Sequence, residues 1–221
     1  MARPAPTRTE RLVLRPVAIE DEAAVLQYRG DPVATQYLSH GPLSPEANFA
    51  RLVQLVDAAE SSGVDWFNFG WAIELRETGE VIGEGRTWNS AEPPAPGRIP
   101  ADCASLGYVL HPDHHGRGFG REAAGALVNW LFEQRGTQTV FAGVYEPNLP
   151  SSRLLAGLGF RRDRHFTSLQ DTTGKNLPSW RYRLDRAKEP AGSRTAAQQG
   201  PRPLRFGSGM DMPSSRAQER T

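Results

Sequence analysis

A glycine-rich turn flanked by histidine and arginine is the stretch of this sequence with the clearest chemical potential. Its glycines lie between the apolar segment 106–110 and a helix-forming run that begins at Phe119. Glycine allows a backbone to approach a ligand closely, and the first amides of a helix lack intrahelical partners and carry partial positive charge. The pattern predicts an anion site, in particular one for phosphate. The residues expected to form it are His115, Gly116, Arg117, Gly118, Phe119, Gly120 and Arg121.

Other nucleotide-binding turns fit this stretch less well. A dinucleotide-binding turn needs G-x-G-x-x-G and an acidic residue about 20 positions later, whereas this turn has G-x-G-x-G and no acidic residue at that place. A P-loop needs G-K-S/T, which is absent. A close-packed structural turn stays open as the alternative.

Composition limits the class of protein. The 221 residues are 38% hydrophobic, enough for one sizeable core, and a formal net charge of +1 gives no global reason to expect nucleic acid or an anionic membrane. Cys103 is the only cysteine, which excludes an intramolecular disulfide and a cysteine-based metal site. The first ten residues hold no apolar signal region and no apolar run is long enough to span a membrane, so we expect a cytoplasmic protein.

Hydrophobic periodicity and turn residues predict the elements that position the turn. Strands are expected at 11–15, 66–75, 81–88, 104–111, 139–145, 160–169 and 179–184. Helices are expected at 19–29, from 45 to about 63, at 119–135 and at 151–158. Loops are expected at 31–45 and at the proline-rich segment 91–101.

The ends of the chain differ from its centre. We expect an N-terminal extension at 1–8, a catalytic domain at 9–185 and a polar, mildly basic tail at 186–221. The tail is too poor in apolar residues to build a core. A flexible tail and a partner-binding arm both remain open for it.

Three blocks of the sequence resemble the GNAT superfamily of acyl-CoA-dependent N-acyltransferases, within it the branch that acetylates ribosomal-protein N-termini. His115–Gly120 resembles the family's pyrophosphate signature, 106–112 resembles its fourth strand, and 146–160 resembles its N-x-x-S and closing L-G-F. The resemblance covers about 9–184. It implies an α+β fold with a splayed, mostly antiparallel mixed sheet of about seven strands, flanked by about four helices.

The resemblance implies acetyl-CoA, or another short acyl-CoA, as cosubstrate and no metal. It implies that main-chain groups of Tyr108, Val109 and Leu110 pair with the pantetheine arm, with Val109 offering an oxyanion donor, and that Asn148 and Ser151 contribute from the next helix. Three positions depart from the family. His115 replaces a glutamine or arginine, Leu155 replaces the tyrosine that many members use as an acid, and Ser105 replaces a carboxylate that often precedes the Gly-Tyr of the fourth strand.

Without a tyrosine at position 155, other residues must transfer the protons. Ser151 matches the serine that this branch is proposed to use as proton donor, although helix capping is its alternative role. Glu84, Glu146 and His165 are candidates for the general base, each with a purely structural alternative. An α-amine with a pKa near 7.7 needs less help from a base than a lysine near 10.4, so a weakly basic acceptor is favoured.

Aromatic residues could form the acceptor pocket, with core packing as their alternative role. They are Tyr37, Trp66, Phe67, Phe69, Trp71 and Trp88, and the segment 91–101 is expected to rim them. Cys103 is expected to be a buried filler rather than a nucleophile.

The resulting hypothesis is acyl transfer to a primary amine, in particular a protein N-terminus. Transfer to a small amine such as an antibiotic or polyamine, and a non-catalytic acyl-CoA sensor, stay open, as does a homodimer.

Overall fold

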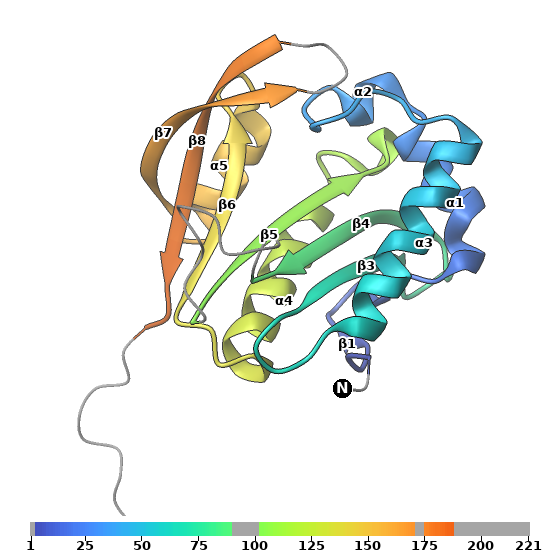
Figure 1. The fold of residues 1–221 in the computed structure, drawn as a ribbon, viewed down its shortest axis with the longest axis horizontal. Helices are drawn as coiled ribbons and strands as arrows, with labels where there is room; N and C mark the ends of the chain where they lie inside the picture. The colour runs from blue at the N-terminus through green and yellow to red at the C-terminus, as the bar shows by residue number, and fades with distance from the viewer. Residues whose placement is uncertain (1–2, 90–101, 171–174, 188–221) are drawn as a thin grey trace, which may run out of the picture. The chain divides into compact units, whose positions relative to one another are not determined.

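An eight-stranded mixed sheet forms the centre of the computed structural model, which describes residues 3–89, 102–170 and 175–187 (Figure 1). In spatial order its strands are β1 (Thr7–Arg8), β2 (Leu12–Pro16), β3 (Asn68–Leu75), β4 (Val81–Trp88), β5 (Cys103–Leu110), β6 (Thr139–Tyr145), β8 (Lys175–Asp185) and β7 (Arg161–Gln170). Every neighbouring pair is antiparallel except β5 and β6. The expected mixed, mostly antiparallel α+β sheet is confirmed. The additional strand is β1, which lies in the predicted N-terminal extension and pairs with β2.

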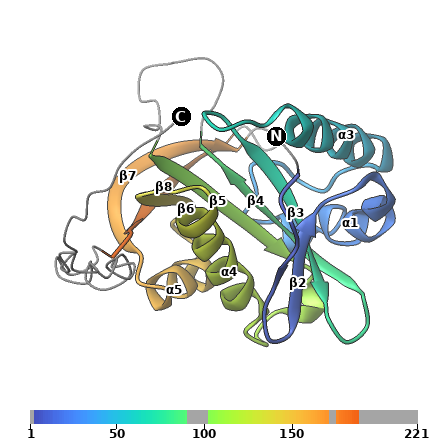
Figure 2. The same ribbon diagram turned by 90° about the horizontal axis from the view of Figure 1, so that it is seen from below.

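Helices cover both faces of this sheet. They are α1 (Glu22–Arg29), α2 (Pro32–Thr35), α3 (Pro45–Ser61), α4 (Phe119–Gln134) and α5 (Leu149–Gly157), with 3-10 turns at Ile19–Asp21 and Pro112–His114. Figure 2 shows α4 and α5 on one side of the sheet and α1 and α3 on the other.

The short helix α2 lies where the sequence predicted only loop. Asp31 caps it by accepting hydrogen bonds from the amides of Val33 at 2.8 Å and Ala34 at 2.7 Å, and Pro32 takes its first position. Ser44 and Pro45 start α3 in the same way, as predicted. The starting signal of α2 was therefore present in the sequence, but only one turn follows it.

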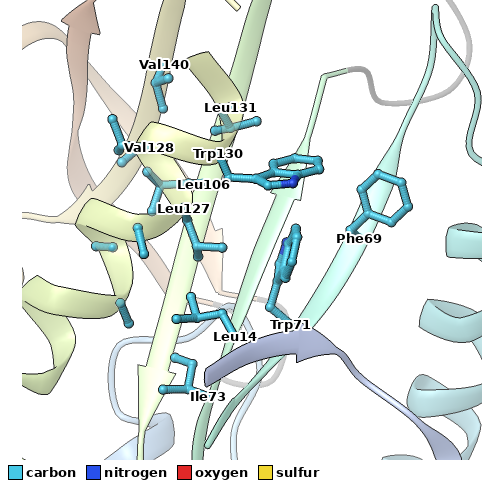
Figure 3. Close-up of a cluster of buried hydrophobic side chains, with 14 of the residues drawn as sticks. Leu14, Phe69, Trp71, Ile73, Leu106, Leu127, Val128, Trp130, Leu131 and Val140 are labelled. Carbon is cyan, nitrogen blue, oxygen red and sulfur yellow. The ribbon is translucent and has the colours of Figure 1, made fainter. Parts of the chain in front are cut away.

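The core lies between α4 and strands β2–β5, where Phe69, Trp71 and Trp130 meet (Figure 3). The ring centroids of Trp71 and Trp130 are 4.8 Å apart, and Trp71 Nε1 donates to Thr87 Oγ1 at 2.9 Å. Phe69 and Trp71 were expected to line the acceptor pocket, and that expectation is wrong because their strand positions face α4. Phe67 is likewise buried, in contact with Phe69.

Strands β5 and β6 pair only at their beginnings. Their register holds from Cys103–Thr139 to Ser105–Phe141 and then stops. Beyond that point β5 continues to pair with β4 as far as Leu110, and β6 continues to pair with β8 as far as Tyr145. The sheet therefore splays between 106–110 and 142–145, and this gap is a place where a ligand can join the strand edge.

The proline-rich segment 91–101 and the tail beyond 187 lie outside the described residues, so the expectations about them stay predictions. Within the described ranges, the helices are too short or too polar to cross a membrane.

Candidate active site

The glycine turn takes the backbone shape that an anion site requires. Gly116 has φ +71° and Gly118 has φ +83°, a left-handed conformation that side chains with a Cβ rarely adopt. Gly118 is the N-cap of α4, and the amide of Glu122 makes the first helical hydrogen bond to its carbonyl at 3.1 Å. The amides of 119–121 precede that bond, so they have no intrahelical acceptor and lie at the positive end of the helix.

The turn is anchored on the strand side by His115. Its Nε2 atom lies 3.1 Å from the carbonyl oxygen of Leu110, at the end of β5. Gly120 permits close packing of α4, because a Cβ there would lie 3.1 Å from Leu154 Cδ1 of α5. The substitution of the family's glutamine or arginine by His115 therefore places a ring that fixes the turn to the splayed strand.

The N-terminal segment holds the turn from the other side. Arg11 donates from Nη1 to the carbonyl of Arg117 at 3.0 Å and from Nε to Glu122 Oε2 at 2.7 Å. Thr9 Oγ1 donates to Oε1 of the same carboxylate at 2.5 Å. Burial raises the pKa of Glu122, but the hydrogen bonds from Thr9 and Arg11 outweigh it and lower the pKa overall. No sequence pattern predicted this contact.

Two cations stand beside the amides. Arg117 and Arg121 are both exposed, and Arg121 donates to the carbonyl of Gly157 at 2.8 Å. A groove of about 780 Å³ borders this turn and runs along α4, with Gly118, Arg121 and Leu158 among its lining residues. The groove lies between α4 and the N-terminal segment and is not bordered by the strand gap, whereas residues 116–118 of the turn are themselves exposed, as a diphosphate site requires.

The free edge of β5 presents alternate main-chain groups to the gap. The amide of His111 donates to the carbonyl of Ile82 next to β4, at 2.8 Å. Because hydrogen-bonding direction alternates along a strand, Val109 also faces β4, whereas Tyr108 and Leu110 face the gap. Val109 was expected to offer an oxyanion donor, but its amide points to the neighbouring strand.

Two hydroxyl groups meet beside the gap. Tyr108 Oη of β5 and Ser151 Oγ of α5 are 2.9 Å apart. Burial raises the pKa of Tyr108 to about 12, with the hydrogen bond to Ser151 acting in the opposite direction. Asn148, rather than Ser151, caps α5, since its Oδ1 accepts from the amide of Ser151 at 3.1 Å. The hydroxyl of Ser151 is therefore free of the capping role that the sequence left open for it.

Comparison with known proteins agrees with this geometry. A family model described as an acetyltransferase (GNAT) domain matches residues 11–161. The chain belongs to the GNAT acetyltransferase family. It is therefore an acyl-CoA-dependent N-acetyltransferase, and the family implies the use of acetyl-CoA. The glycine turn, the strand gap and the hydroxyl pair are the features in which this GNAT enzyme would hold that cosubstrate.

Individual relatives cover most of the chain. N-acetyltransferase p20 of Bacillus licheniformis is 29% identical over 177 residues, which span 80% of this chain and 93% of the relative. FsC-acetyl coenzyme A-N(2)-transacetylase of Aspergillus fumigatus is 24% identical, with 82% and 75% covered. The crystal structure of ribosomal-protein-S5-alanine acetyltransferase from Vibrio fischeri shares the fold, with a TM-score of 0.64, 19% identity and coverage of 82% and 97%.

The two carboxylates predicted as general base lie in different surroundings. Glu84 is fully buried and is ion-paired to Arg29 at 2.9 Å and to Arg51. Burial raises the pKa of Glu84, but the two guanidinium groups outweigh it and hold the pKa below its usual value. Glu146 is exposed on the turn between β6 and α5, where its Oε2 lies 3.8 Å from Nε2 of His165.

The remaining predicted residues are scattered. Tyr37, Trp66 and Trp88 are half-buried, and Trp88 lies against Gly107, where an added Cβ would be 3.8 Å from its ring. Cys103 is buried, and burial together with Asp102 raises the pKa of its thiol, which suits a filler. Within the described residues, no three His, Cys, Asp or Glu side chains gather as metal ligands would.

Proposed function

We propose that this GNAT enzyme acetylates the α-amine at the N-terminus of a protein. In this proposal, Tyr108 orients the hydroxyl of Ser151, which donates a hydrogen bond to the leaving sulfur. The observation that carries the proposal is the 2.9 Å contact between their hydroxyl oxygens beside the gap. Together with the glycine turn, this contact supports a site built for group transfer.

The residues present fit a bound acyl-CoA. The amides of 119–121 and the guanidinium of Arg117 suit a diphosphate, and the gap-facing groups of Tyr108 and Leu110 suit an extended amide-bearing arm. Bound acetyl-CoA would supply an activated acyl thioester. The chain supplies orientation, since both anchors of the turn fix these donors relative to β5.

The hydroxyl pair favours hydrogen-bond donation toward a leaving sulfur. With a pKa of about 12, the Tyr108 phenol stays protonated at neutral pH and can donate to Ser151 Oγ. Transfer of the phenol proton itself to a thiolate with an ordinary pKa of about 8.5 would be uphill by roughly 5 kcal/mol. We therefore assign Tyr108 to orienting Ser151, whose hydroxyl then donates into the gap, while the proton that is finally transferred comes from the acceptor amine.

The available bases favour an α-amine. Deprotonating a lysine costs about 4 kcal/mol more at neutral pH than deprotonating an N-terminal amine, given pKa values of about 10.4 and 7.7. Glu84 is engaged by two arginines and is a weak proton acceptor. Glu146, with His165 beside it, is exposed and can accept the proton of a weakly basic amine. The shared fold with a ribosomal-protein-S5-alanine acetyltransferase supports the same acceptor class.

Thiol release with a panel of amines tests the proposal. Peptides with a free N-terminus are compared with the same peptides blocked at the N-terminus but carrying lysine, and with polyamines and aminoglycosides. Mass spectrometry of the products locates the acetyl group. We expect turnover with free N-termini and little with blocked peptides. Turnover confined to polyamines or aminoglycosides would contradict the proposal.

A further inference from the structure

The face of β4 opposite α4 carries charge close to the gap. Glu84 and Arg86 lie on this face, because strand side chains alternate and Gly85 between them faces Leu127 of α4. Arg86 is in register with Gly107 of β5, two residues beyond the point where β5 and β6 separate. The glycine turn that suits the cosubstrate lies at the start of α4. The face of the sheet opposite α4 is therefore left for the acceptor.

Positive charge exceeds negative charge beneath this face. The carboxylate of Glu84 receives Arg29 Nη2 at 2.9 Å and Arg51 Nη1 at 3.0 Å, so two guanidinium groups share one buried anion. Arg29 Nη1 also lies 2.9 Å from His40 Nε2. Because arginine can only donate, His40 Nε2 accepts this hydrogen bond. His40 is therefore neutral and does not offset the positive charge.

Polar atoms next to this cluster remain without partners. Within the described part of the chain, the Tyr28 hydroxyl and the Arg29 Nε are buried and make no hydrogen bond. Both residues are at least nine-tenths buried. These atoms are out of reach of a ligand, but the excess of positive charge in the cluster favours an anion on the neighbouring exposed surface, where Arg86 lies.

Arg86 is oriented for such an anion. Its Nε donates to Asn68 Oδ1 at 2.9 Å, and its Cζ lies 5.2 Å from the centroid of the Trp88 ring. The residue is exposed, and its terminal Nη groups have no partner among the residues that the structure describes. Burial of part of its side chain lowers the pKa of Arg86, and the charges of Arg51 and Arg29 act in the same direction while Glu84 opposes them. A guanidinium fixed at Nε presents a planar pair of donors, the arrangement that binds carboxylate or phosphate.

We infer that the acceptor is an amine that carries an anionic group close to the reacting nitrogen, and that Arg86 binds this group. For a protein N-terminus, this means an acidic side chain within the first residues. The inference rests on the proposed function and adds the chemical class of its acceptor. Cationic acceptors are disfavoured, because like charges would be brought together on a partly desolvated face.

Matched peptides test the inference. Four peptides share one N-terminal residue and differ at the next two positions, which hold Glu-Glu, Ala-Ala, Lys-Lys or phosphoserine-Ala. Steady-state thiol release gives kcat/KM for each at saturating acetyl-CoA. We expect the Glu-Glu peptide to exceed the Ala-Ala peptide by about 10- to 150-fold, the range for a hydrogen bond to a charged group, and the Lys-Lys peptide to be poorest. A phosphoserine peptide that exceeds the Glu-Glu peptide would assign the same donors to phosphate.

Substitutions of Arg86 test whether this residue causes the preference for acidic peptides. Arg86→Ala should remove most of the difference between the Glu-Glu and Lys-Lys peptides, and Arg86→Glu should invert it. Arg86→Lys should keep part of it, because the charge remains without the fork. Arg8→Ala, which removes one positive charge from β1 at the far edge of the sheet, is the control and should keep the full preference.

Equal kcat/KM for the Glu-Glu and Lys-Lys peptides, or a preference that survives Arg86→Ala, would overturn the inference. Calorimetric titration of the same peptides into the CoA-saturated enzyme gives a second readout that does not need turnover. Absence of turnover with every peptide would reject the N-terminal acceptor, whereas selective binding of the acidic peptide would still uphold the role of Arg86. Binding without charge preference would reject it.

Discussion

Removing the two hydroxyl groups one at a time and together tests whether Tyr108 and Ser151 act as a unit. We expect Ser151→Ala to lower kcat by about 10²- to 10³-fold, the usual range for losing one donor that stabilises developing negative charge. Tyr108→Phe removes the partner 2.9 Å away and leaves the Ser151 hydroxyl less well oriented. One such hydrogen bond contributes about 1–3 kcal/mol when its loss leaves a partly buried group unpaired, which corresponds to about 5- to 150-fold in kcat.

The double variant carries the decisive information. If Tyr108 acts only through Ser151, Tyr108→Phe should cost nothing further in the Ser151→Ala background, so the two effects should be strongly non-additive. The assay is steady-state thiol release at saturating peptide and acetyl-CoA, with urea unfolding of each variant as the control for stability. A KM for acetyl-CoA that changes little would confirm that the defect lies in the transfer step. Additive losses in kcat, or an unchanged kcat in Ser151→Ala, would refute the reasoning.

Three further predictions concern the glycine turn and the buried carboxylate of Glu84. Gly118→Ala should raise the KM for acetyl-CoA, because a Cβ at φ +83° costs about 1 kcal/mol and would lie 3.3 Å from Arg11 Nη2; an unchanged KM would show that the turn tolerates the side chain. Glu122→Gln should raise the same KM several-fold by weakening the hold of Arg11, with kcat retained, and a loss of kcat alone would contradict this role. Glu84→Gln should destabilise the fold by about 3–5 kcal/mol, since the buried Arg29 and the partly buried Arg51 lose their anion. Because the pKa of folded Glu84 is depressed, the wild-type stabilisation should be present above about pH 4.5 and lost as the pH falls further. Urea unfolding midpoints measured against pH check this. A Glu84→Gln variant that loses as much stability in acid as the wild type would contradict it.

The shape of the glycine turn could be predicted from the sequence because its determinants are local. Gly116 and Gly118 are needed for positive φ, and Phe119 begins an amphipathic helix, so residues within one short stretch define the donors. The strand before it and the start of α3 follow from the same kind of local signal.

Contacts between distant residues could not be predicted in this way. Tyr108 and Ser151 are 43 positions apart, and Arg11 and Glu122 are 111 apart, so both contacts depend on how the sheet splays and where the N-terminus pairs. Tyr108 was expected to contribute only main-chain groups. Its side chain became a candidate only once the gap placed α5 opposite β5.

The aromatic residues of β3 show a second limit of sequence patterns. The strand is buried on both faces, under α4 on one side and α3 on the other, so its apolar residues do not alternate with polar ones. Without that alternation, the sequence does not show which face carries the acceptor. Phe69 and Trp71 face α4, and the face that we propose for the acceptor carries Arg86 and Asn68 instead.

Amide chemical shifts of the ¹⁵N-labelled enzyme during titration with acetyl-CoA test most directly whether the turn and the gap hold the cosubstrate. We expect the largest changes at Gly116–Arg121 and at Tyr108 and Leu110, with only small changes at Val109, whose amide faces β4. Binding that shifts other amides while these stay unchanged would contradict the account.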